Sequence, residues 1–106
     1  MHAEFLVRIT AAAERDLEEL WTYIAADQPE QASRFLLQLE SRLLSLERYP
    51  LRCSPIPENE LLGTGYRHLV HGNYRAIFRV SDHIVYILRI IHGARLLDSS
   101  MFEAEV

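Results

Sequence analysis

Arginine and histidine side chains gather in the second half of the chain, and they are the residues best able to do chemistry. Residues 61–95 hold five arginines against one acidic residue, Asp82, and four histidines lie among them. Guanidinium groups bind phosphates and carboxylates through paired hydrogen bonds, and a nearby histidine can move a proton. Such a group would bind an anion or stabilise a developing phosphorane. The alternative is that strand arginines keep a sheet edge soluble or pair with acids on other elements, and composition alone favours this alternative.

Other common chemistries find little support in the sequence. Every basic residue is an arginine, so no reaction can use a lysine amine. The histidines follow no zinc-ligand spacing, and His68 and His71, on one expected strand, would point to opposite faces. Cys53 is the single cysteine, and a small hydrophobe is the simpler interpretation of it. The glycines are scattered rather than grouped into a phosphate-binding loop. We therefore expect no metal and no cofactor.

The overall composition is that of a small globular protein. The 106 residues suit a single domain over residues 1–106, with 49% apolar residues and a net charge of −4. Residues 1–50 hold five arginines against nine acidic residues, so this part of the chain is acidic while residues 61–95 are basic. No apolar run is long enough to span a membrane, and the start does not have the pattern of a secretory signal. With its lone cysteine, the chain is expected in the cytoplasm.

The first half predicts one strand and two helices. Residues 4–9 are short and rich in branched and aromatic side chains, as in a strand, and Thr10 is a plausible N-cap for the helix that follows. Asp27 is expected to cap the second helix, with Pro29 in its first turn. Each helix has an apolar face, so the two should pack as an antiparallel hairpin. The residues expected on these faces are Ala13, Leu17, Leu20, Trp21 and Ile24 in the first helix, and Ala32, Phe35, Leu36, Leu39, Leu43 and Leu46 in the second.

The second half predicts a loop over residues 50–65 and then three strands over residues 66–71, 74–80 and 84–91. Gly72 and Asn73 form a two-residue hairpin signal, and the last strand is apolar on both faces, as in the interior of a sheet. The element order β-α-α-β-β-β with a C-terminal tail predicts an α+β two-layer sandwich, a helical hairpin on a small, mostly antiparallel sheet. Only the tail would be left to cover the other sheet face, which would carry arginines and stay open to a partner.

Several segments, in this order and spacing, resemble the RelE/ParE toxin superfamily of bacterial type II toxin–antitoxin modules. They cover roughly residues 4–96, and the long hairpin, the loop at residues 57–60 and the tail look most like the ParE branch. The segments are Asp-Leu-Glu-Glu-Leu-Trp-Thr-Tyr-Ile (16–24), Gln-Ala-Ser-Arg-Phe (31–35), Tyr-Pro (49–50), Gly-Tyr-Arg (65–67), Tyr-Arg-Ala-Ile-Phe-Arg-Val (74–80) and Ile-Leu-Arg-Ile-Ile-His (87–92).

The two branches of this superfamily imply different functions. RelE-like toxins are ribosome-dependent mRNA endonucleases, and here that activity would use Arg67, Arg75, Arg79 and His92. The RelE-like lysines are absent, Gly93 follows His92 in place of a tyrosine, and the negative net charge suits neither the ribosomal A site nor direct binding of nucleic acid. The ParE-like function, a plasmid-stabilisation toxin that binds and inhibits DNA gyrase without being an enzyme, is therefore preferred. A degenerate member that keeps only antitoxin binding is the third alternative.

The resemblance also implies two partners and places their contacts. The segment after the last strand is implicated in ParE-like toxicity, although a tail that only covers a sheet edge explains its apolar residues equally well. The residues expected to bind the gyrase target are Arg67, Arg75, Arg89, His92, Arg95, Leu97, Met101 and Phe102. A ParD-like antitoxin is expected to lay an amphipathic segment on the hairpin at Leu37 and Leu44, which lie off the main apolar stripe.

Overall fold

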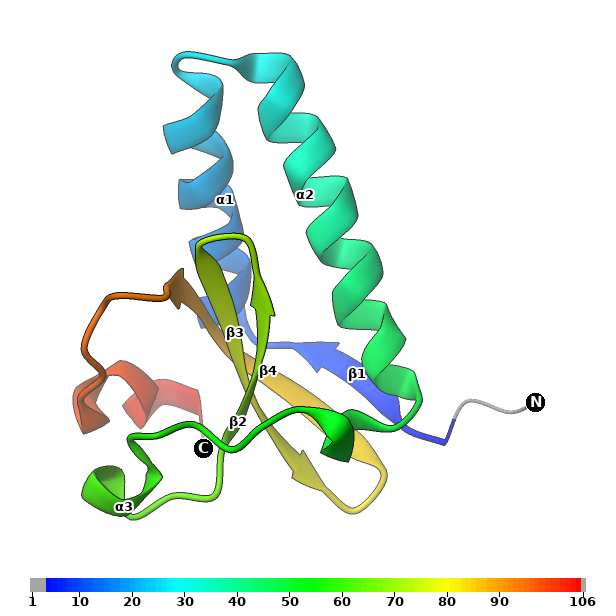
Figure 1. Cartoon of the computed structure of the whole chain (residues 1–106), viewed down its shortest axis with the longest axis vertical. Coiled ribbons are helices and arrows are strands. Elements are labelled where there is room, and N and C mark those ends of the chain that lie inside the picture. Colours follow the sequence, from blue (N-terminus) through cyan, green and yellow to red (C-terminus); the bar gives the residue numbers. More distant parts are fainter. Residues whose placement is uncertain (1–3, 106) are drawn as a thin grey trace.

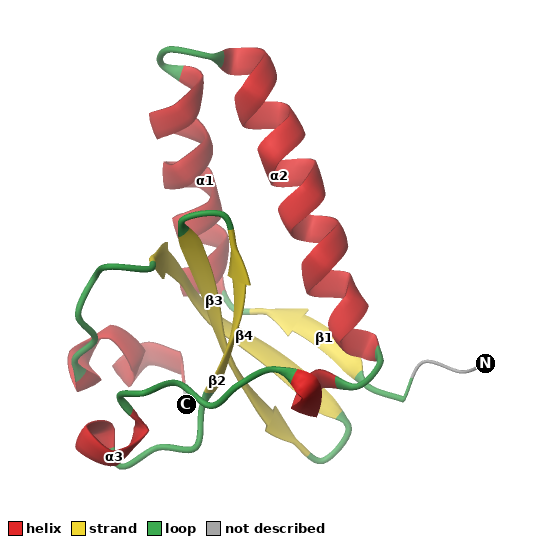
Figure 2. Cartoon of the chain, viewed as in Figure 1, coloured by secondary structure: helices red, strands yellow, loops and turns green. Residues whose placement is uncertain are grey.

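The protein is described by a computed structural model that covers residues 4–105, with side chains described through Phe102. A helical hairpin lies on one face of a four-stranded sheet and rises beyond it (Figures 1 and 2). The elements are β1 (Leu6–Ile9), α1 (Ala11–Ala25), α2 (Pro29–Leu44), α3 (Asn59–Leu62), β2 (Arg67–His71), β3 (Tyr74–Ser81) and β4 (Ile84–His92), with 3-10 segments at Ser45–Glu47, Pro50–Arg52 and Ser99–Glu105. The predicted α+β class and element order are confirmed.

The sheet has the strand order β1-β4-β3-β2, with β1 parallel to β4 and the other neighbours antiparallel. The central β4 is the strand predicted to be apolar on both faces. The turn between β2 and β3 is the predicted pair Gly72–Asn73, where Gly72 has a φ of 60° that a residue without a Cβ adopts easily. No helix among residues 4–105 is long and apolar enough to cross a membrane.

The start of α1 agrees with the sequence, but the start of α2 does not. Thr10 caps α1, because its hydroxyl accepts a hydrogen bond from the Ala13 N–H at 3.2 Å. The prediction that Asp27 caps α2 is wrong: Gln28 holds that position and makes no side-chain cap bond. The first helical residue is Pro29, which has no N–H to satisfy, so α2 begins without an acidic cap.

Most of the predicted apolar faces are buried, with one clear exception. Leu17 and Leu20 on α1 and Leu39 and Leu43 on α2 lie in the core between helices and sheet. Trp21 was expected there but is 43% exposed. It follows Leu20 by roughly 100° around the helix, which turns its side chain away from the buried face formed by Ala13, Leu17 and Leu20.

The second face of the sheet is less open than the sequence predicts. It carries its own apolar cluster, and the cover comes from two segments, the C-terminal tail and the segment over residues 53–66. The latter was expected to be a loop throughout, but it contains α3 and contributes buried side chains. The buried members of this second core are Ile56, Ile77, Leu88, Ile91, Leu97, Met101 and Phe102. The chain hides these side chains itself, because leaving them in water would be costly.

Candidate functional site

The five arginines of the basic segment, residues 61–95, do not form one cluster. Arg67 lies on the helix-facing side of β2, the same side as the buried Leu69. Its Nη1 donates to the carbonyl oxygens of Cys53 at 2.6 Å and Leu51 at 3.4 Å. Arg75 lies on the opposite side of the sheet. The two guanidinium groups therefore cannot hold the same phosphate.

A cavity of about 480 Å³ at the end of the β2–β3 hairpin brings together the candidate polar groups. It is lined by His68 from β2, Arg75 from β3, His92 from the end of β4, and Glu58 just before α3. His92 and Arg75 were predicted as site residues. Glu58 was not, because nothing in the pattern of residues 57–60 relates it to a strand that follows many residues later.

The guanidinium group of Arg75 forms an ion pair with the Glu58 carboxylate. Its Nη1 and Nη2 donate to Glu58 Oε1 and Oε2 at 3.1 and 2.5 Å, and only 7% of the Arg75 side chain and 17% of the Glu58 side chain are exposed. Nη2 also lies 3.4 Å from the carbonyl oxygen of Arg95, and Nη1 lies 3.3 Å from His68 Nδ1. The buried Nε has no hydrogen-bond partner within the described part of the chain. Arg75 is thus a neutralised cation.

The segment that carries Glu58 is held in place by the residue that follows it. The Asn59 amide nitrogen donates to the Tyr66 carbonyl at 2.8 Å, and its oxygen accepts from the Tyr66 N–H at 2.9 Å and the Thr64 hydroxyl at 2.7 Å. Gly63 ends α3 with a φ of 70°, which lets the chain turn back toward β2. This closed turn fixes Glu58 over Arg75.

Titratable groups of this region are shifted in one consistent direction. The hydrogen bond from Arg75 lowers the pKa of the Glu58 carboxyl. Burial lowers the pKa of His68, and the Arg75 charge lowers it further. Burial also lowers the pKa of His71, which lies on the other side of the sheet against Phe35 and Arg42. The folded chain therefore binds protons on these groups more weakly than the unfolded chain does.

This direction predicts a loss of stability in acid. As the pH falls below about 6.5, the unfolded chain protonates its histidines first, and below about 4.5 it also protonates Glu58 first. The melting temperature should fall between pH 7 and pH 5.5, and again below pH 4.5. A thermal melt of His68→Gln should show a weaker fall in the first interval. His83→Gln, at the exposed β3–β4 turn, is the matched control and should retain the wild-type fall.

The remaining predicted arginines lie outside this cavity or at its edge. The Cζ of Arg79 lies 4.3 Å from the centre of the Tyr86 ring, on the second face of the sheet. Arg95 is exposed just beyond β4. Neither joins the Arg75 pair through its side chain in the described structure.

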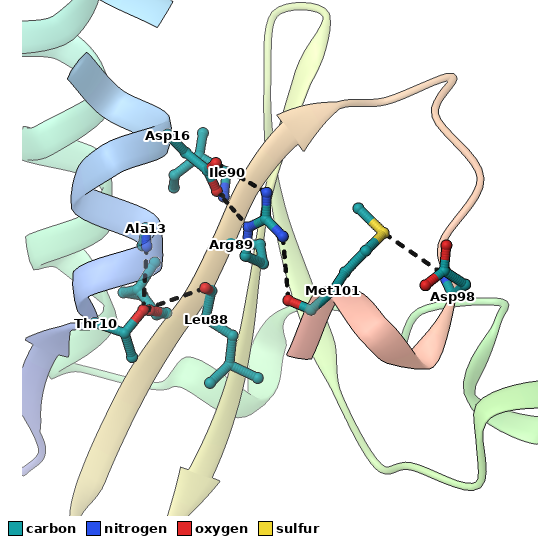
Figure 3. A network of polar contacts seen from close by, with 9 residues as sticks. Thr10, Ala13, Asp16, Leu88, Arg89, Ile90, Asp98 and Met101 are labelled. Atoms are coloured by element: carbon teal, nitrogen blue, oxygen red, sulfur yellow. Dashed lines mark hydrogen bonds and ion pairs between the residues drawn. The ribbon is translucent and has the colours of Figure 1, made fainter. Parts of the chain in front are cut away.

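Arg89 connects the hairpin, the sheet and the tail (Figure 3). Opposite Ile77 and Phe78, β4 has one extra residue, and this bulge brings Arg89 beside α1. Its Nε and Nη2 donate to the Asp16 carboxylate at 2.7 and 3.0 Å, and its Nη1 donates to the Met101 carbonyl at 3.1 Å. Asp16 also accepts from the Ile90 N–H at 2.9 Å. Sequence analysis predicts Arg89 as a target contact; in the structure its side chain is 17% exposed and bonds within the chain.

The predicted partner-binding hydrophobic residues separate into buried and exposed groups. Leu97, Met101 and Phe102 of the tail are 6–8% exposed, whereas Leu96 beside them is 85% exposed. Leu37 and Leu44 on α2 are 67% and 56% exposed, so their expected exposure is confirmed. Within residues 4–102, no histidine, cysteine and carboxylate side chains come together as three or more potential metal ligands.

Comparisons with known proteins give one consistent relationship. A family model described as the ParE toxin of the type II toxin–antitoxin system parDE matches residues 7–97. A comparison with curated protein sequences gave no match. The structure resembles a chain of the chromosomal ParDE system from P. aeruginosa, with a TM-score of 0.68 and 21% identity over 86% of this chain and 98% of that one.

Two further similar chains come from RelBE complexes. One belongs to the toxin–antitoxin complex RelBE2 from Mycobacterium tuberculosis, with a TM-score of 0.62 and 29% identity over 84% of this chain and 98% of that one. The other belongs to the archaeal RelE–RelB complex from Pyrococcus horikoshii OT3, with a TM-score of 0.53 and 23% identity over 88% of this chain and 99% of that one. Both share the fold described above.

Proposed function

Because this chain belongs to the ParE toxin family of type II toxin–antitoxin systems, we propose that it acts in the cytoplasm by binding and inhibiting DNA gyrase, and that it does not cleave RNA. It is the toxin of such a module, and its structural neighbours come from toxin–antitoxin complexes. The resemblance to the ParE branch supports gyrase as the target. One observation of the structure favours an inhibitor over a nuclease: the Arg75 guanidinium group is already paired with the Glu58 carboxylate.

The energetics of that pair argue against a nuclease site. A scissile phosphate at Arg75 would have to displace Glu58, which already makes two hydrogen bonds to the guanidinium group, so the phosphate would gain only the difference between the two pairings. Of the other arginines considered for cleavage, Arg67 is on the opposite face of the sheet and Arg79 lies over Tyr86. Of the other three residues proposed for cleavage, only His92 lines the cavity that holds Arg75. The absence of lysine and the net charge of −4 point the same way.

The surface that we assign to the target is the exposed end of β4 and the start of the tail. Of the residues expected to contact gyrase, Leu97, Met101 and Phe102 are buried by the chain itself. His92 and Arg95 are exposed, and Leu96 presents nearly its whole side chain to solvent. Arginine is enriched among the residues that dominate the binding energy of protein interfaces, and Leu96 adds an exposed apolar side chain beside Arg95.

Two assays separate the inhibitor from the nuclease. Primer extension on mRNA isolated after toxin expression should find no new 5′ ends within translated codons. Immobilised toxin should retain purified gyrase, and Leu96→Glu should weaken that retention at least tenfold. Leu61→Glu, on α3 and 83% exposed in the wild type, is the matched control and should bind as the wild type does. Codon-internal cuts, or no retention of gyrase, would contradict the proposal.

The proposed ParD-like antitoxin has a separate surface on α2. Leu37 and Leu44 are seven residues apart, two turns of one helix, and both are exposed, so they present an apolar stripe to a helical segment of a partner. We expect Leu37→Glu with Leu44→Glu to weaken antitoxin binding at least a hundredfold in calorimetric titration. The melting temperature should stay within about 2 °C of wild type, because exposed positions contribute little to stability. Unchanged affinity, or an equal loss in Leu61→Glu, would count against this surface.

A further inference from the structure

A row of three side chains crosses the sheet on the face away from the helices. Arg8 on β1 pairs in register with Tyr86 on β4, and Tyr86 pairs in register with Arg79 on β3. The neighbours of these residues along each strand, among them Val7 and Val85, point into the core under the helices. By the alternation of side chains along a strand, Arg8, Tyr86 and Arg79 therefore share the opposite face.

This row lies at the margin of the second core: Tyr86 is half-buried against that core, whereas Arg8 at the end of the row is exposed. The tail and the segment over residues 53–66 pack on Ile77, Leu88 and Ile91, toward the other end of β4. Beside the row, Leu6 of β1 is 57% exposed, and Arg8 itself is exposed. On this face, β1 is therefore exposed and the first half of β4 is partly exposed.

The two arginines of the row differ from the other arginines of the sheet. Arg67 is held by carbonyl oxygens, Arg75 by Glu58 and Arg89 by Asp16. No carboxylate in the described part of the chain pairs with Arg8 or Arg79, and the guanidinium of Arg79 lies on the Tyr86 ring. Among the described residues, these two arginines without a carboxylate partner stand on the strands to either side of Tyr86, and they make a positive strip on a chain whose net charge is negative.

We propose that the Arg8–Tyr86–Arg79 row binds an extended, acidic polypeptide segment of a protein partner. The inference goes beyond the proposed function, because it adds a contact surface separate from α2 and from the end of β4. Neighbouring strands are about 4.8 Å apart, so the two arginine backbones are about 10 Å apart across β4. An extended chain covers that distance in about three residues, so carboxylates two or three positions apart reach both guanidinium groups.

The geometry favours a polypeptide over a nucleic acid. Single-stranded nucleic acids bind by stacking bases on aromatic rings, and Arg79 already covers a face of the Tyr86 ring. Two arginines neutralise few phosphates, and the rest of the molecule, at −4 overall, repels a long polyanion. An acidic peptide needs only two well-placed carboxylates, each of which can accept paired hydrogen bonds from a guanidinium.

The test uses the whole chain with an N-acetylated octa-aspartate peptide as the probe, and an eight-nucleotide oligothymidine of similar charge as the comparison. Titration of ¹⁵N-arginine-labelled protein in low salt should shift the side-chain Nε–Hε signals of Arg8 and Arg79 together. Arg8→Gln with Arg79→Gln should weaken peptide binding at least tenfold. Arg15→Gln with Arg34→Gln removes the same charge from exposed positions on the helices and should bind as the wild type does.

Each alternative result overturns the inference. If octa-aspartate shifts no arginine signals, or shifts all of them equally, the row is not a site. If the control pair weakens binding as much as the test pair, only the net charge matters. If the oligothymidine binds Arg8 and Arg79 more tightly than the peptide does, the partner is a nucleic acid. None of these outcomes depends on gyrase, so this inference and the proposed function fail separately.

Discussion

Asp16→Asn is expected to lower the free energy of unfolding by about 3–5 kcal/mol, because it breaks a buried ion pair and leaves Arg89 uncompensated. The Asp16 and Arg89 side chains are only 9% and 17% exposed, so water cannot replace the lost carboxylate easily. Urea unfolding followed by circular dichroism measures the change. In a chain of this size, such a loss corresponds to a fall in melting temperature of roughly 15–30 °C.

The size of this effect follows from where Asp16 lies. β1 ends at Ile9, opposite Ile87, so the second half of β4 has β3 on one side and no strand on the other. The Asp16 carboxylate accepts the Ile90 N–H, which would otherwise lack a partner on that open side. Arg89 also donates a hydrogen bond to the Met101 carbonyl, so the same ion pair holds the tail. Glu19→Gln, an exposed acid on the same helix, is the matched control and should change stability by less than about 0.5 kcal/mol. Equal midpoints for both variants would contradict the role of Asp16.

Phe102→Ala should cost about 3–5 kcal/mol, because it empties the place where the tail meets the second core. The Phe102 ring is 8% exposed, and its centre lies 5.1 Å from that of Tyr66. Truncation after Arg95 also removes Leu97 and Met101, so the loss approaches the whole stability of a small domain. We expect the truncated chain to lose its cooperative thermal transition.

A matched pair in the tail separates structure from target binding. Leu96→Ala removes a side chain that is 85% exposed, so its melting temperature should equal that of the wild type while its inhibition of gyrase falls. Phe102→Ala should show the opposite pattern: its melting temperature should fall, whereas the folded protein that remains should still inhibit gyrase. If the truncated chain melts cooperatively at the wild-type temperature, the tail does not support the fold.

Local patterns predicted most of the architecture, because they depend on neighbouring residues. Strand alternation, the Thr10 cap and the Gly72–Asn73 turn each involve residues within a few positions of one another. The side of the sheet on which Arg67 lies was available from the same alternation, since Leu69 is apolar and two residues away. The prediction for Asp27 is wrong because α2 begins one residue later than that cap requires, with Gln28 at the N-cap and Pro29 as the first helical residue.

The candidate site was harder to predict, because its decisive contacts are long-range. Glu58 meets Arg75 from a loop 17 residues earlier, and Asp16 meets Arg89 across 73 residues. No spacing rule connects such positions. Both pairs contain arginines, Arg75 and Arg89, that the sequence analysis predicts as contacts to the target. In the folded chain, the charges of Arg75 and Arg89 are therefore paired with carboxylates, whereas Arg79 and Arg95 have no such partner among the described residues.

The most direct test of gyrase inhibition without RNA cleavage is a supercoiling titration with purified components. Toxin at increasing molar ratio is added to gyrase and relaxed plasmid, and the products are separated on an agarose gel. We predict a dose-dependent loss of supercoiling activity that the cognate antitoxin reverses. The control variant Leu61→Glu should inhibit gyrase as the wild type does. Full supercoiling at a large molar excess of folded toxin would contradict the proposed function.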